Sequence, residues 1–131
     1  MAIASYEYVA RDVDEVKDMA SRSGRILLTL LEEMRVINSN HPVAQFLYEE
    51  GAQFICDVLD GRHPLPSSVV IRHRYSDAPE SMEPYPLLDK ALNIFSLSIH
   101  TVQPSVLPQW LEQLESDFAE REVGAGRRQR H

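Results

Sequence analysis

The clearest pattern of hydrophobic and polar positions lies between Val13 and Ile37, where apolar or small residues recur at alternating steps of four and three. This spacing places them on one face of a helix and is typical of a bundle or coiled-coil seam. Asp12, followed three positions later by Glu15, resembles a capping box and predicts that the helix begins near Asp12. Gly24 interrupts the pattern at a cost of about 1 kcal/mol relative to Ala, which indicates a close backbone crossing or a bend. The seam consists of Val16, Ala20, Ser23, Leu27, Leu30, Met34 and Ile37.

A second helix is predicted between Pro42 and Leu59. The preceding residues 38–41 offer capping side chains, and a proline suits the first turn of a helix. Gly61 is a stop signal just after the helix. Because the connection to the first helix is short, the two helices should form an antiparallel hairpin. The apolar stripe of this helix comprises Val43, Phe46, Leu47, Phe54, Ile55, Val58 and Leu59.

A short strand is predicted at residues 68–75, where β-branched side chains are followed by a polar alternation. Its expected partner is the segment Ile3–Val9, in which Tyr6 and Tyr8 also favour an extended backbone. A ribbon of two strands is marginal unless it packs on other elements, so an irregular arm is the alternative.

Two further helices are predicted in the C-terminal half. Three prolines between residues 76 and 86 indicate a loop, after which a third helix runs from Leu88 to Val102 and is ended by Pro104. A fourth helix covers Leu107–Phe118, and residues 123–131 should form a flexible basic tail behind a single domain of residues 1–122. The sequence therefore predicts an all-α fold, a four-helix-like bundle with an N-terminal helical hairpin and a minor two-stranded ribbon.

The charge of the chain is unevenly distributed. The 131 residues have a formal net charge of −7, and because the tail holds three arginines and no acid, residues 1–122 carry −10. A body of this sign repels phosphate backbones, so we expect no direct binding of nucleic acid. The single cysteine, Cys56, implies no disulfide, and no run of roughly 18 apolar residues occurs. These features favour a cytoplasmic protein that does not enter a membrane.

No pattern of reactive residues indicates catalysis. The five histidines fall in different segments, and none has the spacing of a zinc site. Cys56 lacks a histidine signature that would make it a nucleophile, and the sequence contains no phosphate loop or serine elbow. We therefore expect no catalytic, cofactor or metal site. An enzyme would have to assemble its pocket from distant residues such as His41, Glu49 and His100.

The first helix carries more apolar side chains than its seam requires, including Ile26, Leu28 and Leu31. Either helices three and four cover this surplus within one chain, or a second copy or another protein covers it. The favoured function is a non-enzymatic regulator that binds another protein through an apolar helical face, with a homodimer formed through helix one. The candidate partner-binding residues are Leu27, Leu30, Leu31, Met34, Phe46, Leu47 and Phe54.

The segment from Ala44 to Val58 resembles a family of short, uncharacterised bacterial proteins built on a two-helix unit. The shared pattern is Ala-x-aromatic-Leu-x-Glu followed by Ile-x-Asp-Val, and the likeness covers residues 13–59, with Pro42 in place of the family's tryptophan. This family implies no activity. In size, acidity and lack of chemistry the chain is also similar to antiactivators that block quorum-sensing transcription factors, which implies a transcription factor as partner. The alternative is a secretion-type chaperone, a class of similar size and charge that has a substantial sheet.

Overall fold

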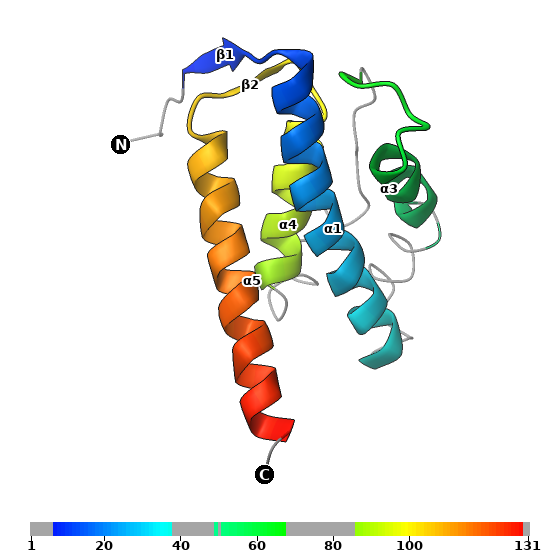
Figure 1. The fold of residues 1–131 in the computed structure, drawn as a ribbon, viewed down its shortest axis with the longest axis vertical. Helices are drawn as coiled ribbons and strands as arrows, with labels where there is room; N and C mark the ends of the chain where they lie inside the picture. Colours follow the sequence, from blue (N-terminus) through cyan, green and yellow to red (C-terminus); the bar gives the residue numbers. More distant parts are fainter. Residues whose placement is uncertain (1–6, 38–48, 50, 68–85, 130–131) are drawn as a thin grey trace.

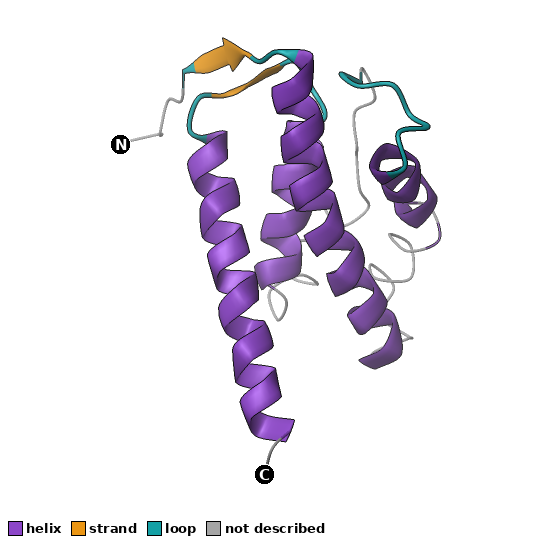
Figure 2. Ribbon diagram, viewed as in Figure 1, coloured by secondary structure: helices purple, strands orange, loops and turns teal. Residues whose placement is uncertain are grey.

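The computed structural model of the chain describes residues 7–37, 49, 51–67 and 86–129. This part of the chain forms an all-α bundle with one small antiparallel ribbon, which confirms the predicted fold class (Figures 1 and 2). Its elements are β1 (Tyr8–Ala10), α1 (Val13–Ile37), α3 (Ala52–Leu59), α4 (Pro86–Ser98), β2 (Val102–Pro104) and α5 (Leu107–Gln129).

The bundle is organised around α1 and α4. α1 packs against α3, α4 and α5, and α4 also packs against α5. α3 lies on the opposite side of α1 from α5 (Figure 1). The ribbon lies across one end of the bundle, where β1 leads into α1 and β2 leads into α5. The hydrophobic core therefore runs along the shared faces of these helices, with Phe95 of α4 fully buried within it.

The N-terminus of α1 is capped as the sequence predicts. The Asp12 side chain accepts a hydrogen bond from the Glu15 backbone N–H at 2.8 Å, and the Asp12 carbonyl accepts one from Val16 at 3.0 Å. Glu15 does not return the bond to the cap, since its carboxylate lies 3.6 Å from the guanidinium of Arg11. Half of the capping box is thus formed, and it is the half that satisfies a free N–H of the first turn.

Gly24 is a point where side chains of α3 and α4 come close to the backbone of α1. A Cβ atom at this position would lie 3.0 Å from Cε1 of Phe95 and 3.4 Å from Cδ2 of Leu59. The residue therefore lets an aromatic ring of α4 and a side chain at the end of α3 reach the backbone of α1. The close crossing that the sequence predicts is confirmed.

α3 ends at Leu59, two residues before the glycine that the sequence marks as a stop. Gly61 adopts a φ of 76°, and its N–H bonds to the Val58 carbonyl at 3.2 Å. The N–H of Arg62 bonds to the Asp57 carbonyl at 2.8 Å, which completes a Schellman motif. Residues 38–48 and 50, including the predicted beginning of this helix and its connection to α1, lie outside the described residues.

The predicted ribbon forms, but its second strand comes from a different part of the chain. β1 pairs with β2 in the register Tyr8 with Pro104, Val9 with Gln103 and Ala10 with Val102. Residues 68–75, the partner that the sequence suggested, lie outside the described residues. The sequence analysis assigned Val102 to the third helix, and this assignment is wrong because α4 ends at Ser98.

Gln103 explains why α4 ends before the apolar stripe does. Its buried side-chain amide donates hydrogen bonds to the carbonyls of Ser98 at 2.9 Å and His100 at 2.8 Å. The last carbonyls of a helix have no N–H donor within the helix, and the Gln103 amide supplies hydrogen-bond donors at this end of α4. Val102, which helical spacing placed on the core side, is 58% exposed on the ribbon. The hydrogen bonds of a buried amide thus end the helix before the hydrophobic period does.

Ion pairs connect α5 to α1 along their length. Arg22 donates from Nε to Glu115 at 3.0 Å, and its Nη2 atom contacts the other oxygen of the same carboxylate. Hydrogen bonding to Glu115 raises the pKa of Arg22, while partial burial opposes the shift. Arg121 pairs with Glu33 farther along. α5 continues to Gln129, beyond the predicted end near Phe118, and the mobility of residues 123–131 stays a prediction.

Filling the crossing at Gly24 should destabilise the protein. Leucine favours a helix over glycine by up to about 1 kcal/mol, but overpacking a closed core costs about 1–3 kcal/mol. Because Phe95 is fully buried, a leucine at residue 24 would have to displace its ring within the core, and we expect Gly24→Leu to lower the free energy of unfolding by about 2 kcal/mol. Chemical denaturation measures this, with Arg25→Leu at the adjacent exposed position as the matched control. Equal stability of the two variants would show that the crossing is not tight.

Gln103 can be tested by a change that keeps its size. Gln103→Met removes the amide and leaves the Ser98 and His100 carbonyls without their side-chain donor. We expect a loss of about 2 kcal/mol, since a buried acceptor that loses its donor costs about 1–3 kcal/mol. Thermal melting measures the loss, and Gln109→Met at an exposed position of α5 is the control. A Gln103→Met variant as stable as this control would contradict the capping role.

Candidate functional site

The apolar face of α1 that the sequence offered for partner binding lies inside the bundle. Its four candidate residues belong to one hydrophobic cluster with residues of α3, α4 and α5, and none is more than 8% exposed. Helices of the same chain therefore cover this face, which was one of the two alternatives left open by the sequence. A partner could reach these side chains only by opening the bundle. The four residues are Leu27, Leu30, Leu31 and Met34.

The three remaining candidates belong to the second predicted helix. Phe46 and Leu47 lie outside the described residues. Phe54 is half-buried, and its ring packs edge-on against Phe95 and against His63, with centroid distances of 6.2 and 4.7 Å. Phe54 thus contributes to the joint between α3 and α4.

The seam of α1 is likewise used within one chain. Its members Val16, Ala20, Ser23, Leu27, Leu30 and Met34 are all buried. The predicted homodimer through helix one would require these residues to face a second copy, whereas they face α3, α4 and α5.

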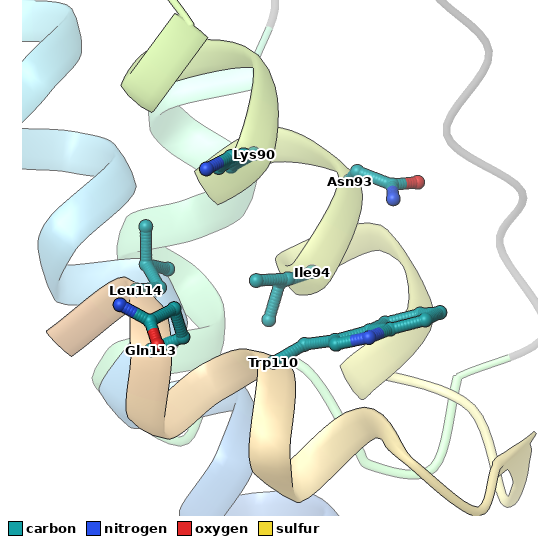
Figure 3. Close-up of a pocket in the computed structure, with 6 residues that line it drawn as sticks. All are labelled: Lys90, Asn93, Ile94, Trp110, Gln113 and Leu114. Atoms are coloured by element: carbon teal, nitrogen blue, oxygen red, sulfur yellow. The ribbon is translucent and has the colours of Figure 1, made fainter. Parts of the chain in front are cut away.

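An open groove of about 370 Å³ lies between α4 and α5. Figure 3 shows Ile94 of α4 and Leu114 of α5 lying between the two helices, with the indole of Trp110 extending from α5 beneath α4. Ile94 and Leu114 are buried, and Trp110 is half-buried. The floor of the groove is therefore apolar, and the largest side chain that lines it is that of Trp110, the only tryptophan of the chain.

Polar side chains form the rim of the groove. Lys90 and Asn93 of α4 and Gln113 of α5 are exposed and line the opening (Figure 3). Lys90 lies 3.9 Å from the carboxylate of Asp117, which also accepts a hydrogen bond from Gln113 at 2.9 Å. An apolar floor within a polar rim can hold an apolar side chain from another molecule and exclude water around it.

The groove arises from the way the two helices divide their faces. α4 directs Leu88, Leu92 and Phe95 into the core, while Ile94 and Lys90 lie one helical turn apart on its flank. On α5 the buried residues Leu107, Leu111 and Leu114 form the seam, and Trp110 lies beside it. Sequence reasoning placed Trp110 in the core stripe of the fourth helix. A usable signal was its position beside the seam, one residue before Leu111.

A separate polar cluster joins the loop after α3 to the end of α4. His63 Nε2 lies 3.0 Å from the Ser67 hydroxyl, and His100 Nδ1 lies 2.8 Å from the Ser67 carbonyl. The Ser67 N–H also donates to the Ile99 carbonyl at 2.7 Å. In the described part of the chain no carboxylate orients either imidazole, and Ser67 is buried. These contacts act as a clamp that holds the loop against the end of α4. They do not have the geometry of a serine nucleophile, which needs an oriented base and access to substrate.

Among the residues that the structure describes, the other reactive groups named by the sequence do not gather into a site. Cys56 is a half-buried free thiol in α3. Glu49 is exposed, His100 belongs to the clamp, and His41 lies outside the described residues. Among the residues that the structure places, no group of three or more His, Cys, Asp or Glu could hold a metal ion.

No helix in the described ranges combines the length and the apolar character needed to cross a membrane. Comparisons of the chain with models of protein families, with curated proteins and with solved structures find no match. The site therefore has to be interpreted from its own geometry.

The burial of the α1 face leads to a direct test. Leu30→Glu places a carboxylate in the core, and burying an unpaired charge costs several kcal/mol, so we expect the variant to unfold or to lose most of its stability. Val36→Glu introduces the same group on the same helix at a position that is 80% exposed, and it should change stability by less than about 0.5 kcal/mol. Circular dichroism during denaturation of dilute protein separates the two. A stably folded Leu30→Glu variant would mean that this face is open.

Proposed function

We propose that this chain is a non-enzymatic regulatory protein that binds another protein through the groove between α4 and α5. The observation that carries the proposal is the half-buried Trp110 beside the buried Ile94 and Leu114, within a rim of exposed polar side chains. Protein interfaces have this anatomy, with an apolar centre and a polar rim, and tryptophan is among the residues that contribute most to binding.

The chemistry of the groove favours binding over catalysis. Its lining contains one amine, two amides, an indole and two aliphatic side chains, and the amine of Lys90 is paired with Asp117. None of these groups is a nucleophile held beside a base, which acyl transfer or proton abstraction would require. Recognition of an apolar side chain needs only the groups that are present.

A transcription factor is the partner class implied by the likeness to antiactivators. The acidic body, with a formal charge of −10 over residues 1–122, supports a role in which this protein binds the factor and not its DNA. In that role, adding the protein should release the factor from its operator while the protein itself leaves free DNA untouched. Direct operator binding by the purified chain at physiological salt would contradict it.

Site-specific crosslinking tests the proposed groove. A photoreactive benzoylphenylalanine at Gln113 or Asn93, both on the rim, should capture one and the same protein from native lysate, identified by mass spectrometry. Placed at Lys17 or Glu32, exposed on α1 and outside the groove, it should not capture that protein. The purified partner should then shift the emission of Trp110, because docking removes water from the indole.

The contribution of Trp110 is measured with the same partner. Trp110→Ala should weaken binding at least tenfold, since removal of an interface tryptophan commonly costs about 2 kcal/mol or more. A melting curve shows that the variant remains folded, and Gln109→Ala on the same helix is the control. Capture of the same protein equally from the rim and from α1, or full binding by folded Trp110→Ala, would refute the proposal.

A further inference from the structure

The ribbon end of the bundle carries most of the exposed large apolar side chains. Four large hydrophobic residues are exposed in the described part of the chain, and three of them lie in the ribbon or at the first residue of α1. These three are Tyr8, Val13 and Val102, and the fourth, Val36, lies at the other end of α1. We infer that the edge of β1 pairs with the same edge of a second copy of this chain, which joins the two ribbons into one antiparallel sheet of four strands.

The edge of β1 that faces away from β2 presents backbone groups for a further strand. The C=O of Glu7 and the N–H of Arg11 bond to β2. Because both backbone groups of a strand residue point to the same side, and this side alternates along the strand, Val9 also faces β2 while Tyr8 and Ala10 face outward. Figure 1 shows β1 farther from α4 and α5 than β2, so this edge is directed away from these helices.

β1 lacks the features that usually keep an edge strand from pairing. Natural sheets protect their edges with lysine, proline or a bulge. The outer edge of β2 contains Pro104, which has no N–H to donate to a further strand. β1 has the sequence Tyr-Val-Ala and pairs with β2 without a bulge. An isolated ribbon of two strands is also marginal, and a sheet of four strands is more stable. The edge of β1 is therefore the one that can be extended.

This edge is complementary to itself. With a two-fold axis at Val9, Tyr8 of each copy exchanges backbone hydrogen bonds with Ala10 of the second copy. On the outer face of the joined sheet, the large side chain of Tyr8 then lies across from the small side chain of Ala10. The same register sets the exposed Glu7 opposite Arg11 of the second copy and keeps the two Glu7 carboxylates at opposite ends of the paired strands. Three residues from each copy make a small contact, so the dimer should be weak and reversible.

Sedimentation of the full chain tests whether the dimer forms. Between about 5 and about 500 µM, the wild-type chain should pass reversibly from monomer to dimer. Tyr8→Lys changes both halves of a symmetric contact and should weaken the dimer at least tenfold. Val36→Lys makes the same change in net charge at an exposed apolar position that lies outside the ribbon, and it should alter the dissociation constant by less than about twofold.

A proline separates strand pairing from simple contact between apolar side chains. Ala10→Pro keeps a small apolar side chain but removes an N–H that faces the second copy, and it removes none that faces β2. We expect the dimer to be lost while the monomer stays folded, which circular dichroism and a melting curve check.

Single cysteines identify the register in a Cys56→Ser background. Val9→Cys places the two new thiols directly opposite each other across the two-fold axis, where Cα atoms about 4.5 Å apart can form a disulfide. Ala10→Cys places them diagonally, about 7–8 Å apart, which is too far. In a glutathione buffer, Val9→Cys should form at least tenfold more disulfide-linked dimer than Ala10→Cys or the exposed control Val36→Cys.

Several outcomes would overturn the inference. One is a chain that stays monomeric at about 500 µM. Another is a dimer that Val36→Lys weakens as much as Tyr8→Lys, or that a folded Ala10→Pro variant leaves intact, because another surface would then hold it. If the proline variant does not fold, the cysteine variants decide, and disulfide formation no greater for Val9→Cys than for its controls would contradict the register. The groove between α4 and α5 takes no part in this contact, so none of these outcomes affects the proposed function.

Discussion

The approach of the Phe95 ring to the backbone of α1 at Gly24 is the contact on which the bundle depends. A Cβ atom at residue 24 would lie 3.0 Å from the Phe95 ring, which is tighter than most such contacts, and 3.4 Å from Leu59, which is ordinary van der Waals contact. Side chains of α3 and α4 both reach α1 at Gly24, and the ring of Phe54, which packs on Phe95 and His63, extends this contact to the loop that follows α3. The conformational cost of a glycine within a helix is offset by the burial of an entire aromatic ring.

This crossing decides which surfaces remain for function. Because α4 covers the seam of α1, the longest apolar stripe of the chain is consumed in folding and is not presented to a partner. α4 packs on α1 through one face and on α5 through its flank, and that flank does not close completely. In the described part of the chain, Trp110 and Ile94 therefore line an open groove between the C-terminal helices α4 and α5.

The ribbon and the ion pairs hold the two long helices in place around this groove. β1 and β2 tie the beginning of α1 to the beginning of α5, and the backbone bonds continue past the ribbon from Arg11 to Thr101 and from Ser105 to Glu7. Arg22 and Glu115 then join the same helices farther along. Each of these interactions is modest by itself because it is partly exposed to water. Together they keep α5 in register with α1, so that the position of Trp110 relative to α4 is defined from both sides.

Local interactions explain the parts of the fold that could be predicted from the sequence. α1 begins at Val13 because Asp12 caps it, and a long apolar period runs along the helix to Ile37. α3 ends at Leu59 because Gly61, two residues on, adopts the positive φ that favours glycine. Where the sequence failed, a distant or buried polar group prevailed. Val102 continued a helical period, yet the amide of Gln103 terminates α4 and leaves Val102 to pair with Ala10, more than ninety residues away in the chain.

The candidate site shows the same division. The sequence by itself determined that the chain is a helical, acidic protein without a recognisable reactive motif, because composition, spacing and caps are local properties. It also identified apolar surplus on α1, but not what covers it. Whether Leu30 faces a partner or the core of its own chain, and whether Trp110 closes the core or lies in a groove, depends on how α4 packs against α1 and α5. Only the tertiary structure decided this, since an amphipathic helix has the same period whether its apolar face meets its own chain or another.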